Sequence, residues 1–417
     1  MVEEAPGNPP EFRGRLRGLD GLRGLAILLV MLVHFWRPEE KTALGAAMTR
    51  AARLGWAGVD LFFVLSGFLI TGILMDTRAR PGYLRNFFAR RVLRIFPLYY
   101  LFLAISLLLM PAYFAGISFD RVPGFGHAAD AAAWPWYVSY TSNLWMAHHN
   151  DFSAGLANSL TWSLAIEEQF YLVWPWLILL CPPRRLFAAM AAVFTGAVAF
   201  RAGLALSGSH WLPILVLTPC RVDTLAAGGM LAVYVRSPRF RPQTLRRLSR
   251  AALFVGLPVF AAWVILSRQD VRETTAFQVA GYSLLALGCA GLLAKVLDGD
   301  APAVRKVFHS GPLTSLGKYS YGIYLFHVLL FTAVLPLAFK PVMALLKLVI
   351  LERFFWLFAG IGSSWLLAAG LYHLYEVRFL RLKRFFGPSV PEPGSEHAAV
   401  SSAQLAAGLQ APPAVPR

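Results

Sequence analysis

An arginine and a histidine interrupt an otherwise apolar stretch near the start of the chain. Residues 18–36 read GLDGLRGLAILLVMLVHFW, with Arg23 near the beginning and His34 near the end. Their separation is almost three helical turns, so both side chains would lie on one face, about 16 Å apart along the axis. A charge at bilayer depth is costly and usually faces a protein interior or a watery cavity. The pair therefore indicates a functional path, with a snorkelling Arg23 and a merely packing His34 as the structural alternative.

More acids, bases and cations fall in other apolar segments at a similar expected depth. They are Asp60, Glu167, Glu168, Arg221, Asp223 and His327. So many ionisable groups in one layer exceed what structural pairing usually needs, because each unpaired ion would be strongly destabilising. A site is therefore favoured over the alternative, in which Glu167 pairs with Arg221 only to lock two helices together.

The two adjacent glutamates should differ in role. Glu167 and Glu168 are about 100° apart on a helix and cannot face the same way, so one of them is expected to be structural or interfacial. Ser163 and Tyr171 lie four residues either side of Glu167 and share its face. This spacing predicts a polar stripe along one helix.

A basic cluster precedes the third apolar segment. The stretch RNFFARRVLRIFPLYY places Arg90, Arg91 and Arg94 at the expected mouth of that helix. Guanidinium groups bind phosphate oxygens in bidentate fashion, so the cluster suits a polyphosphate. The alternative is a simple positive-inside anchor.

Two other features are poor candidates for chemistry. Ser66 in FVLSGF lacks the Gly-x-Ser pattern of a nucleophile elbow, and Ser66 with Gly67 suits close helix contact instead. The AHHND segment, with His148 and His149, lacks a third ligand at suitable spacing. We expect no metal site.

Composition places the chain among polytopic membrane proteins. It has 417 residues, 57% of them hydrophobic and 15% charged, and its mean hydropathy is +0.56. The net charge of +17 is spread in short clusters between apolar spans. That pattern indicates topology signals and contacts with anionic lipid headgroups, and it argues against nucleic acid as a partner. Three cysteines without paired spacing suggest neither disulfides nor zinc.

The expected fold is all-α, with about ten transmembrane helices around a polar intramembrane cavity. Candidate spans lie near 19–37, 56–75, 95–114, 160–181, 186–206, 212–235, 251–267, 275–296, 317–338 and 354–377. Pro219 could unwind the sixth span. Lys and Arg concentrate in 78–94 and 236–250, which predicts cytoplasmic N- and C-termini in an inner (plasma) membrane. We expect a cytoplasmic arm over 1–17, a membrane domain over 18–386 and a disordered cytoplasmic tail over 387–417.

Several motifs in order resemble the membrane-bound acyltransferase family 3. They are RGLAILLVMLVH, GVDLFFVLSGFLI, RRVLRIFPLYY, TWSLAIEEQFYLVWP, RVDTLAAGGMLA and LGKYSYGIYLFH, between about residues 18 and 380. The resemblance implies transfer of an acyl group, often acetyl, from cytoplasmic acyl-CoA to a sugar hydroxyl. The acceptor would be a glycan, a lipid-linked sugar or a small glycoside. Acyl-CoA would be a co-substrate, with no permanently bound cofactor.

The resemblance and the depth argument together give each site residue an expected role. The family's arginine and histidine pair matches Arg23 and His34, and its helix 4 glutamate matches Glu167. Acyl transfer needs a base, a stabilised oxyanion and a grip on the donor. The expected base is His34, with Glu167 or Asp60 holding its tautomer and Arg221 stabilising the oxyanion. The four expected donor-binding residues are Arg23, Arg90, Arg91 and Arg94, and the expected substrate contacts are Ser66, Tyr171, His327 and Tyr324.

A different class of function uses similar residues. Proton-coupled transporters and flippases also place His, Asp, Glu and Arg inside the membrane. They predict pseudo-symmetric halves with helices broken at matching positions, and the sequence has no such pairing. A transporter or flippase of an envelope precursor is therefore the alternative to an acyltransferase, and a non-catalytic scaffold is a third, weaker one.

Overall fold

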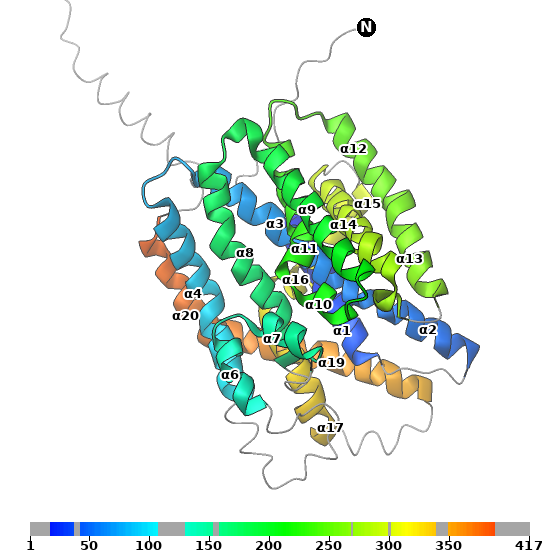
Figure 1. Ribbon diagram of the computed structural model, residues 1–417. Helices are drawn as coiled ribbons and strands as arrows, with labels where there is room; N and C mark the ends of the chain where they lie inside the picture. The colour runs from blue at the N-terminus through cyan, green and yellow to red at the C-terminus, as the bar shows by residue number, and fades with distance from the viewer. Residues whose placement is uncertain are drawn as a thin grey trace, which may run out of the picture.

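The computed structural model describes residues 17–36, 42–106, 130–152, 158–267, 270–298, 302–338 and 349–387. Every regular element in these ranges is helical, as expected (Figure 1). The first helix already includes Arg17. The rest of the expected N-terminal arm and the expected tail from residue 388 lie outside the described residues.

The helices run in this order. The first half of the chain forms α1 (Arg17–Phe35), α2 (Ala43–Arg53), α3 (Ala57–Thr77), α4 (Tyr83–Ala104), α6 (Asp130–Val138), α7 (Ser142–His149), α8 (Thr161–Leu180) and α9 (Leu186–Leu206). The second half forms α10 (Trp211–Val216), α11 (Thr218–Val235), α12 (Pro242–Ala251), α13 (Leu257–Leu266), α14 (Tyr282–Asp298), α15 (Pro302–Phe308), α16 (Gly311–Leu329), α17 (Leu335–Ala338), α19 (Val349–Leu371) and α20 (Val377–Arg381).

Seven helical stretches of the described chain are long and apolar enough to cross a membrane. They contain α1, α3, α9, α11, α13, α14 and α19, so the chain is a polytopic membrane protein. The remaining three expected spans overlap α4, α8 and α16, which are as long as the shortest of the seven but are less apolar. The expected third span also extends past Ser106, outside the described residues.

Two expected boundaries differ in the structure. The helix α4 begins at Tyr83, after Gly82 in the left-handed conformation (φ 72°), so the basic cluster lies within the helix and not ahead of it. No helix-breaking residue separates Tyr83 from the apolar stretch that follows. The expected sixth span is broken at Leu217 between α10 and α11. Pro219, which lacks an N–H, stands in the first turn of α11 and explains the break.

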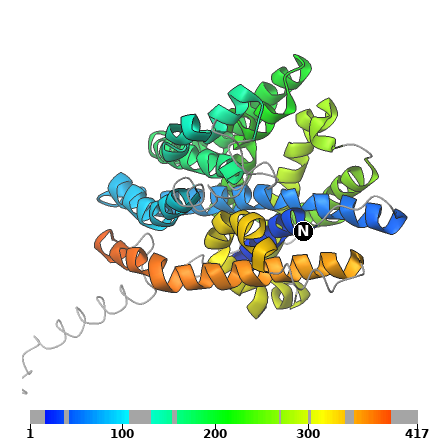
Figure 2. The same cartoon turned by 90° about the horizontal axis from the view of Figure 1, so that it is seen from below.

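The pair formed by α1 and α16 is the centre of the bundle. It lies between α3 and α19, as the view from below shows (Figure 2). The two helices touch backbone to backbone: a Cβ added to Gly317 would lie 1.8 Å from the carbonyl oxygen of Asp20, and one added to Gly24 would lie 2.0 Å from that of Leu313. Gly67 makes the same close approach between α3 and α11, as expected of it.

Two buried ion pairs join the neighbouring helices α3, α9 and α11. Arg221 of α11 pairs with Asp60 of α3, and its guanidinium lies 4.0 Å from the ring centroid of Tyr282. Arg201 of α9 pairs with Asp223 of α11 at 2.9 Å. All four charged side chains are buried to 1% exposure or less. Removing one partner would leave an uncompensated charge inside the bundle.

The close contact of α1 with α16 gives a first prediction. Gly317→Ala should lower the free energy of unfolding by about 1–3 kcal/mol, because the added methyl meets a backbone oxygen and the helices must separate. Gly203→Ala in α9 is the matched control, since its Cβ would meet nothing within 4 Å. Thermal unfolding of the purified proteins in detergent measures both. Equal stability of the two variants would contradict the tight contact.

The buried ion pair gives a second prediction. Asp60→Asn should destabilise the protein by about 3–5 kcal/mol, because Arg221 keeps its charge without a counter-ion. The double variant Asp60→Leu/Arg221→Met should recover much of the loss, since it removes both charges. Chemical denaturation followed by tryptophan fluorescence compares them. A double variant no better than Asp60→Asn would refute the expected role of the pair in packing.

Candidate functional site

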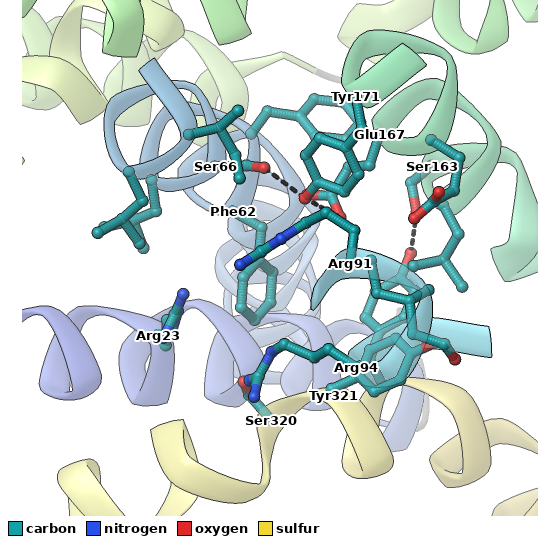
Figure 3. A pocket seen from close by; sticks show the side chains of 18 of the residues that line it. Arg23, Phe62, Ser66, Arg91, Arg94, Ser163, Glu167, Tyr171, Ser320 and Tyr321 are labelled. Carbon is teal, nitrogen blue, oxygen red and sulfur yellow. Dashed lines mark hydrogen bonds between the residues drawn. The ribbon is translucent and has the colours of Figure 1, made fainter. Parts of the chain in front are cut away.

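A cavity of about 120 Å³ opens between five helices, α1, α3, α4, α8 and α16 (Figure 3). Four of the helices contribute several side chains, many of them spaced three or four residues apart as on one helical face, and α1 contributes Arg23. The polar lining consists of Arg23, Ser66, Arg91, Arg94, Ser163, Glu167, Glu168, Tyr171, Ser320, Tyr321 and Tyr324. Residues far apart in the sequence therefore form one polar surface inside an apolar bundle.

The polar stripe expected on α8 lies on the cavity wall. Ser163, Glu167 and Tyr171 all line the cavity. The Tyr171 hydroxyl forms a hydrogen bond of 2.7 Å with the Ser66 hydroxyl and donates to Glu167 Oε2 at 3.4 Å. Figure 3 shows this chain of oxygens facing the cavity. Ser66 therefore faces the cavity, whereas its neighbour Gly67 makes the helix contact.

Tyr324 of α16 closes one end of the cavity. Its hydroxyl forms a hydrogen bond of 2.6 Å with Ser163 of α8. Its ring meets Phe62 of α3 edge to face, with 6.3 Å between centroids. The ring centroid of His327, three residues further along α16, is 6.1 Å away. Tyr324 thus lines the cavity and also lies beside the buried histidine.

Three arginines supply the positive charge of the cavity. Arg23 comes from α1, whereas Arg91 and Arg94 are successive members of one face of α4. Figure 3 shows the three side chains converging from two sides. Asp20 lies 3.7 Å from the Arg23 guanidinium and neutralises part of its charge. The convergence of guanidinium groups suits an anionic ligand such as a phosphate.

Some polar atoms at the cavity have no hydrogen-bond partner among the described residues. They include Arg91 Nε and Glu168 Oε1, both shielded from solvent. Buried polar groups are normally paired, so such atoms point to a ligand or to water. Glu168 was expected to face away from Glu167, yet both line the cavity. The cavity wraps around two faces of α8, which the 100° separation alone did not reveal.

Arg90 lies apart from its two neighbours. Its guanidinium donates to the backbone carbonyls of Lys383 at 3.4 Å, Phe386 at 3.3 Å and Gly387 at 2.7 Å. It lines a second, smaller cavity together with Arg91. Arg91 therefore lies between the two cavities, whereas Arg90 holds the segment that follows α20.

His34 and His327 do not line the cavity, although His327 lies beside Tyr324, which does. Their rings meet edge to face with centroids 5.0 Å apart, and His34 Nδ1 is 3.3 Å from His327 Nε2. His34 is half-buried, whereas His327 is fully buried. The expected contact of His327 with substrate therefore does not fit its position, because it is enclosed and touches His34 instead.

Asp60 and Arg221 do not join the site either. Their side chains pair with each other, away from the cavity lining. The alternative pairing of Arg221 with Glu167 is not found, since Glu167 faces the cavity. Sequence reasoning missed Tyr321 and Ser320, which line the cavity beside Tyr324. The only available signal was their three- and four-residue spacing on one helix.

The chain has relatives among characterised and putative O-acetyltransferases. It is 29% identical over 348 residues to the peptidoglycan O-acetyltransferase OatA of Listeria monocytogenes, which covers 76% of this chain and 50% of that protein. It is 28% identical over 329 residues to the putative peptidoglycan O-acetyltransferase YrhL of Bacillus subtilis, covering 74% and 48%. A putative O-acetyltransferase of Staphylococcus aureus is 28% identical over 326 residues, covering 74% and 50%.

The chain spans about half the length of these curated relatives. No solved structure matches it significantly. The family model described as "Acyltransferase domain" matches residues 16–373. That match includes every helix that lines the cavity, together with His34 and His327. The chain therefore belongs to the acyltransferase 3 family of integral-membrane acyltransferases.

Proposed function

We propose that the protein transfers an acetyl group from cytoplasmic acetyl-CoA to a hydroxyl of a glycan. The observation that carries the proposal is the cavity lined by three arginines and two glutamates, in a chain that belongs to an acyltransferase family. The relatives named for peptidoglycan make a cell-wall glycan the first acceptor to test. A lipid-linked sugar and a small glycoside are the other two candidate acceptors.

The donor is proposed to enter beside α4. Its phosphates would meet Arg91 and Arg94, and its thioester would lie deeper, toward Tyr324. The unpaired Nε of Arg91, located where the two cavities meet, supports a phosphate at that point. Arg23 contributes a third guanidinium from α1. Arg90 is instead proposed to hold the chain that follows α20, because its Nη1 already donates hydrogen bonds to backbone carbonyls there.

The reaction is proposed to occur at the Tyr324 end of the cavity. The acceptor oxygen attacks the thioester carbonyl carbon, the C–O bond forms, and the C–S bond breaks. His34 takes the hydroxyl proton and returns it to the sulfur of CoA, so that proton and charge balance. The guanidinium groups of the cavity are the charges available to stabilise the oxyanion. Movement of Tyr324 would let the acyl group reach His34.

The membrane topology belongs to the same proposal. With ten spans and both termini in the cytoplasm, α1 would carry Arg23 near the inner face and His34 in the outer half. The donor would then bind from the inside, and the acceptor would approach His34 from the outside. This arrangement assigns the protein to the inner membrane of the cell.

Loss of the base gives the first test. His34→Ala should reduce acetyl transfer by at least 10²-fold, because the acceptor hydroxyl loses its proton acceptor. The measurement is CoA release and glycan labelling by purified, reconstituted protein with labelled acetyl-CoA and an envelope extract. Expression and thermal stability serve as controls for folding. A fully active variant would exclude His34 as the base, and a wild type that consumes no acyl-CoA would favour the transport alternative.

The donor grip gives the second test. Arg91→Gln and Arg94→Gln should each raise the KM for acetyl-CoA by about tenfold or more, because each removes a charge-assisted contact with phosphate. Arg85→Gln is the matched control: Arg85 is exposed on the same helix and lines neither cavity. Steady-state kinetics with varied acetyl-CoA separate KM from kcat. If the KM for acetyl-CoA is unchanged in all three variants, Arg91 and Arg94 do not bind the donor and serve only as membrane anchors.

A further inference from the structure

The hydrogen bonds of His34 and His327 indicate which ring nitrogen of each histidine is protonated. His34 Nδ1 lies 2.8 Å from the carbonyl oxygen of Val30, one turn earlier in α1. A carbonyl oxygen accepts hydrogen bonds and cannot donate them, so Nδ1 of His34 carries the proton. A neutral imidazole has only one N–H. Nε2 of His34 therefore has a free lone pair.

The same reasoning applies to the second ring. His327 Nδ1 lies 2.9 Å from the carbonyl oxygen of Tyr324 and 3.0 Å from that of Ile323. Two acceptors at one nitrogen place the proton on Nδ1 and leave Nε2 of His327 as an acceptor. That nitrogen lies 3.3 Å from Nδ1 of His34. The Nδ1–H of His34 is thus shared between the Val30 carbonyl and His327.

We propose that His327 is the positioning residue of His34: its Nε2 accepts the Nδ1–H of His34 and holds the lone pair of His34 Nε2 ready for a proton. The proposed reaction needs this tautomer, and in that respect the inference rests on the proposed function. The sequence assigned this role to Asp60 or Glu167. In the structure, Asp60 forms an ion pair with Arg221, and Glu167 accepts a hydrogen bond from Tyr171. The side chain of His327 is the one that contacts His34.

The position of His327 explains why it suits this role. It is fully buried, so it has no access to substrate and can act only through His34. Its ring is fixed by two backbone carbonyls of α16 and by edge contacts with Phe35 at 5.9 Å and Tyr324 at 6.1 Å. When His34 takes a proton at Nε2, its Nδ1–H keeps both acceptors. A neutral partner thereby orients the base without placing a second charge in the bundle.

Two substitutions of His327 test the proposal. His327→Leu removes the acceptor at similar volume, and His327→Gln keeps an amide oxygen that can accept the same hydrogen bond. We expect the leucine variant to lose about 10²-fold in kcat with an unchanged KM for acetyl-CoA, and the glutamine variant to stay within about tenfold of wild type. His373→Leu is the control, because His373 is an exposed histidine that is hydrogen-bonded to Tyr319. Equal losses in the leucine and glutamine variants would reduce His327 to a packing role and overturn the proposal.

A spectroscopic readout keeps the inference separate from the enzymatic activity. Nitrogen-15 NMR of histidine-labelled protein distinguishes protonated from unprotonated ring nitrogens. The signals of the two histidines are assigned by their loss in His34→Gln and in His327→Gln. We expect both rings of the wild type to be protonated at Nδ1. In His327→Leu, Nδ1 of His34 keeps only the Val30 carbonyl as an acceptor, so we expect the Nε2–H form of His34 to appear beside the Nδ1–H form. A wild-type His34 protonated at Nε2 would overturn the inference. A protein without transferase activity but with the expected tautomers would instead contradict the proposed function alone.

Discussion

The close contact of α1 with α16 is the constraint on which the site depends. Gly24 and Gly317 let the two backbones touch, so that side chains of both helices meet without intervening bulk. The same pair of helices brings His34 beside His327, and it places His327 beside Tyr324 of the cavity lining. A larger residue at either glycine would meet a backbone oxygen of the facing helix and push the two helices apart.

The bundle handles its charges in two different ways. Away from the cavity, Arg221 and Arg201 are each matched with an aspartate, which offsets part of the cost of burying them, although Nε and Nη1 of Arg221 have no hydrogen-bond partner among the described residues. At the cavity, Arg91 and Glu168 keep buried polar atoms without a partner among the described residues. The first group is distinguished by a counter-ion on a neighbouring helix, whereas the second lines a cavity. Charge in the membrane layer is therefore not a sufficient sign of catalysis.

The arrangement also separates the donor grip from the proton chemistry. The arginines of α1 and α4 line the cavity, whereas the histidines lie outside its lining, with His327 beside Tyr324 of the cavity wall. In the proposed reaction, binding energy at the phosphates holds the thioester near that wall, and the histidine pair supplies a base of fixed tautomer. Such a division suits a transferase whose two substrates arrive from opposite faces of a membrane.

The sequence by itself determined the class and the family resemblance, and it named several of the residues that line the cavity. Hydropathy predicted a polytopic helical protein, and helical spacing correctly placed Ser163, Glu167 and Tyr171 on one face. Spacing reports which side chains share a face of one helix, since that property is local. It also identified Pro219 as a helix breaker.

Only the tertiary structure decided which faces meet. Asp60, Glu167 and Arg221 have similar expected depths, so the sequence could not tell which carboxylate pairs with Arg221 or which group touches His34. Those contacts depend on the rotation of each helix and on the close approach of α1 with α16, which are set by packing across the whole bundle. Packing pairs Asp60 with Arg221 and brings His327 into contact with His34. It also places three arginines around one cavity.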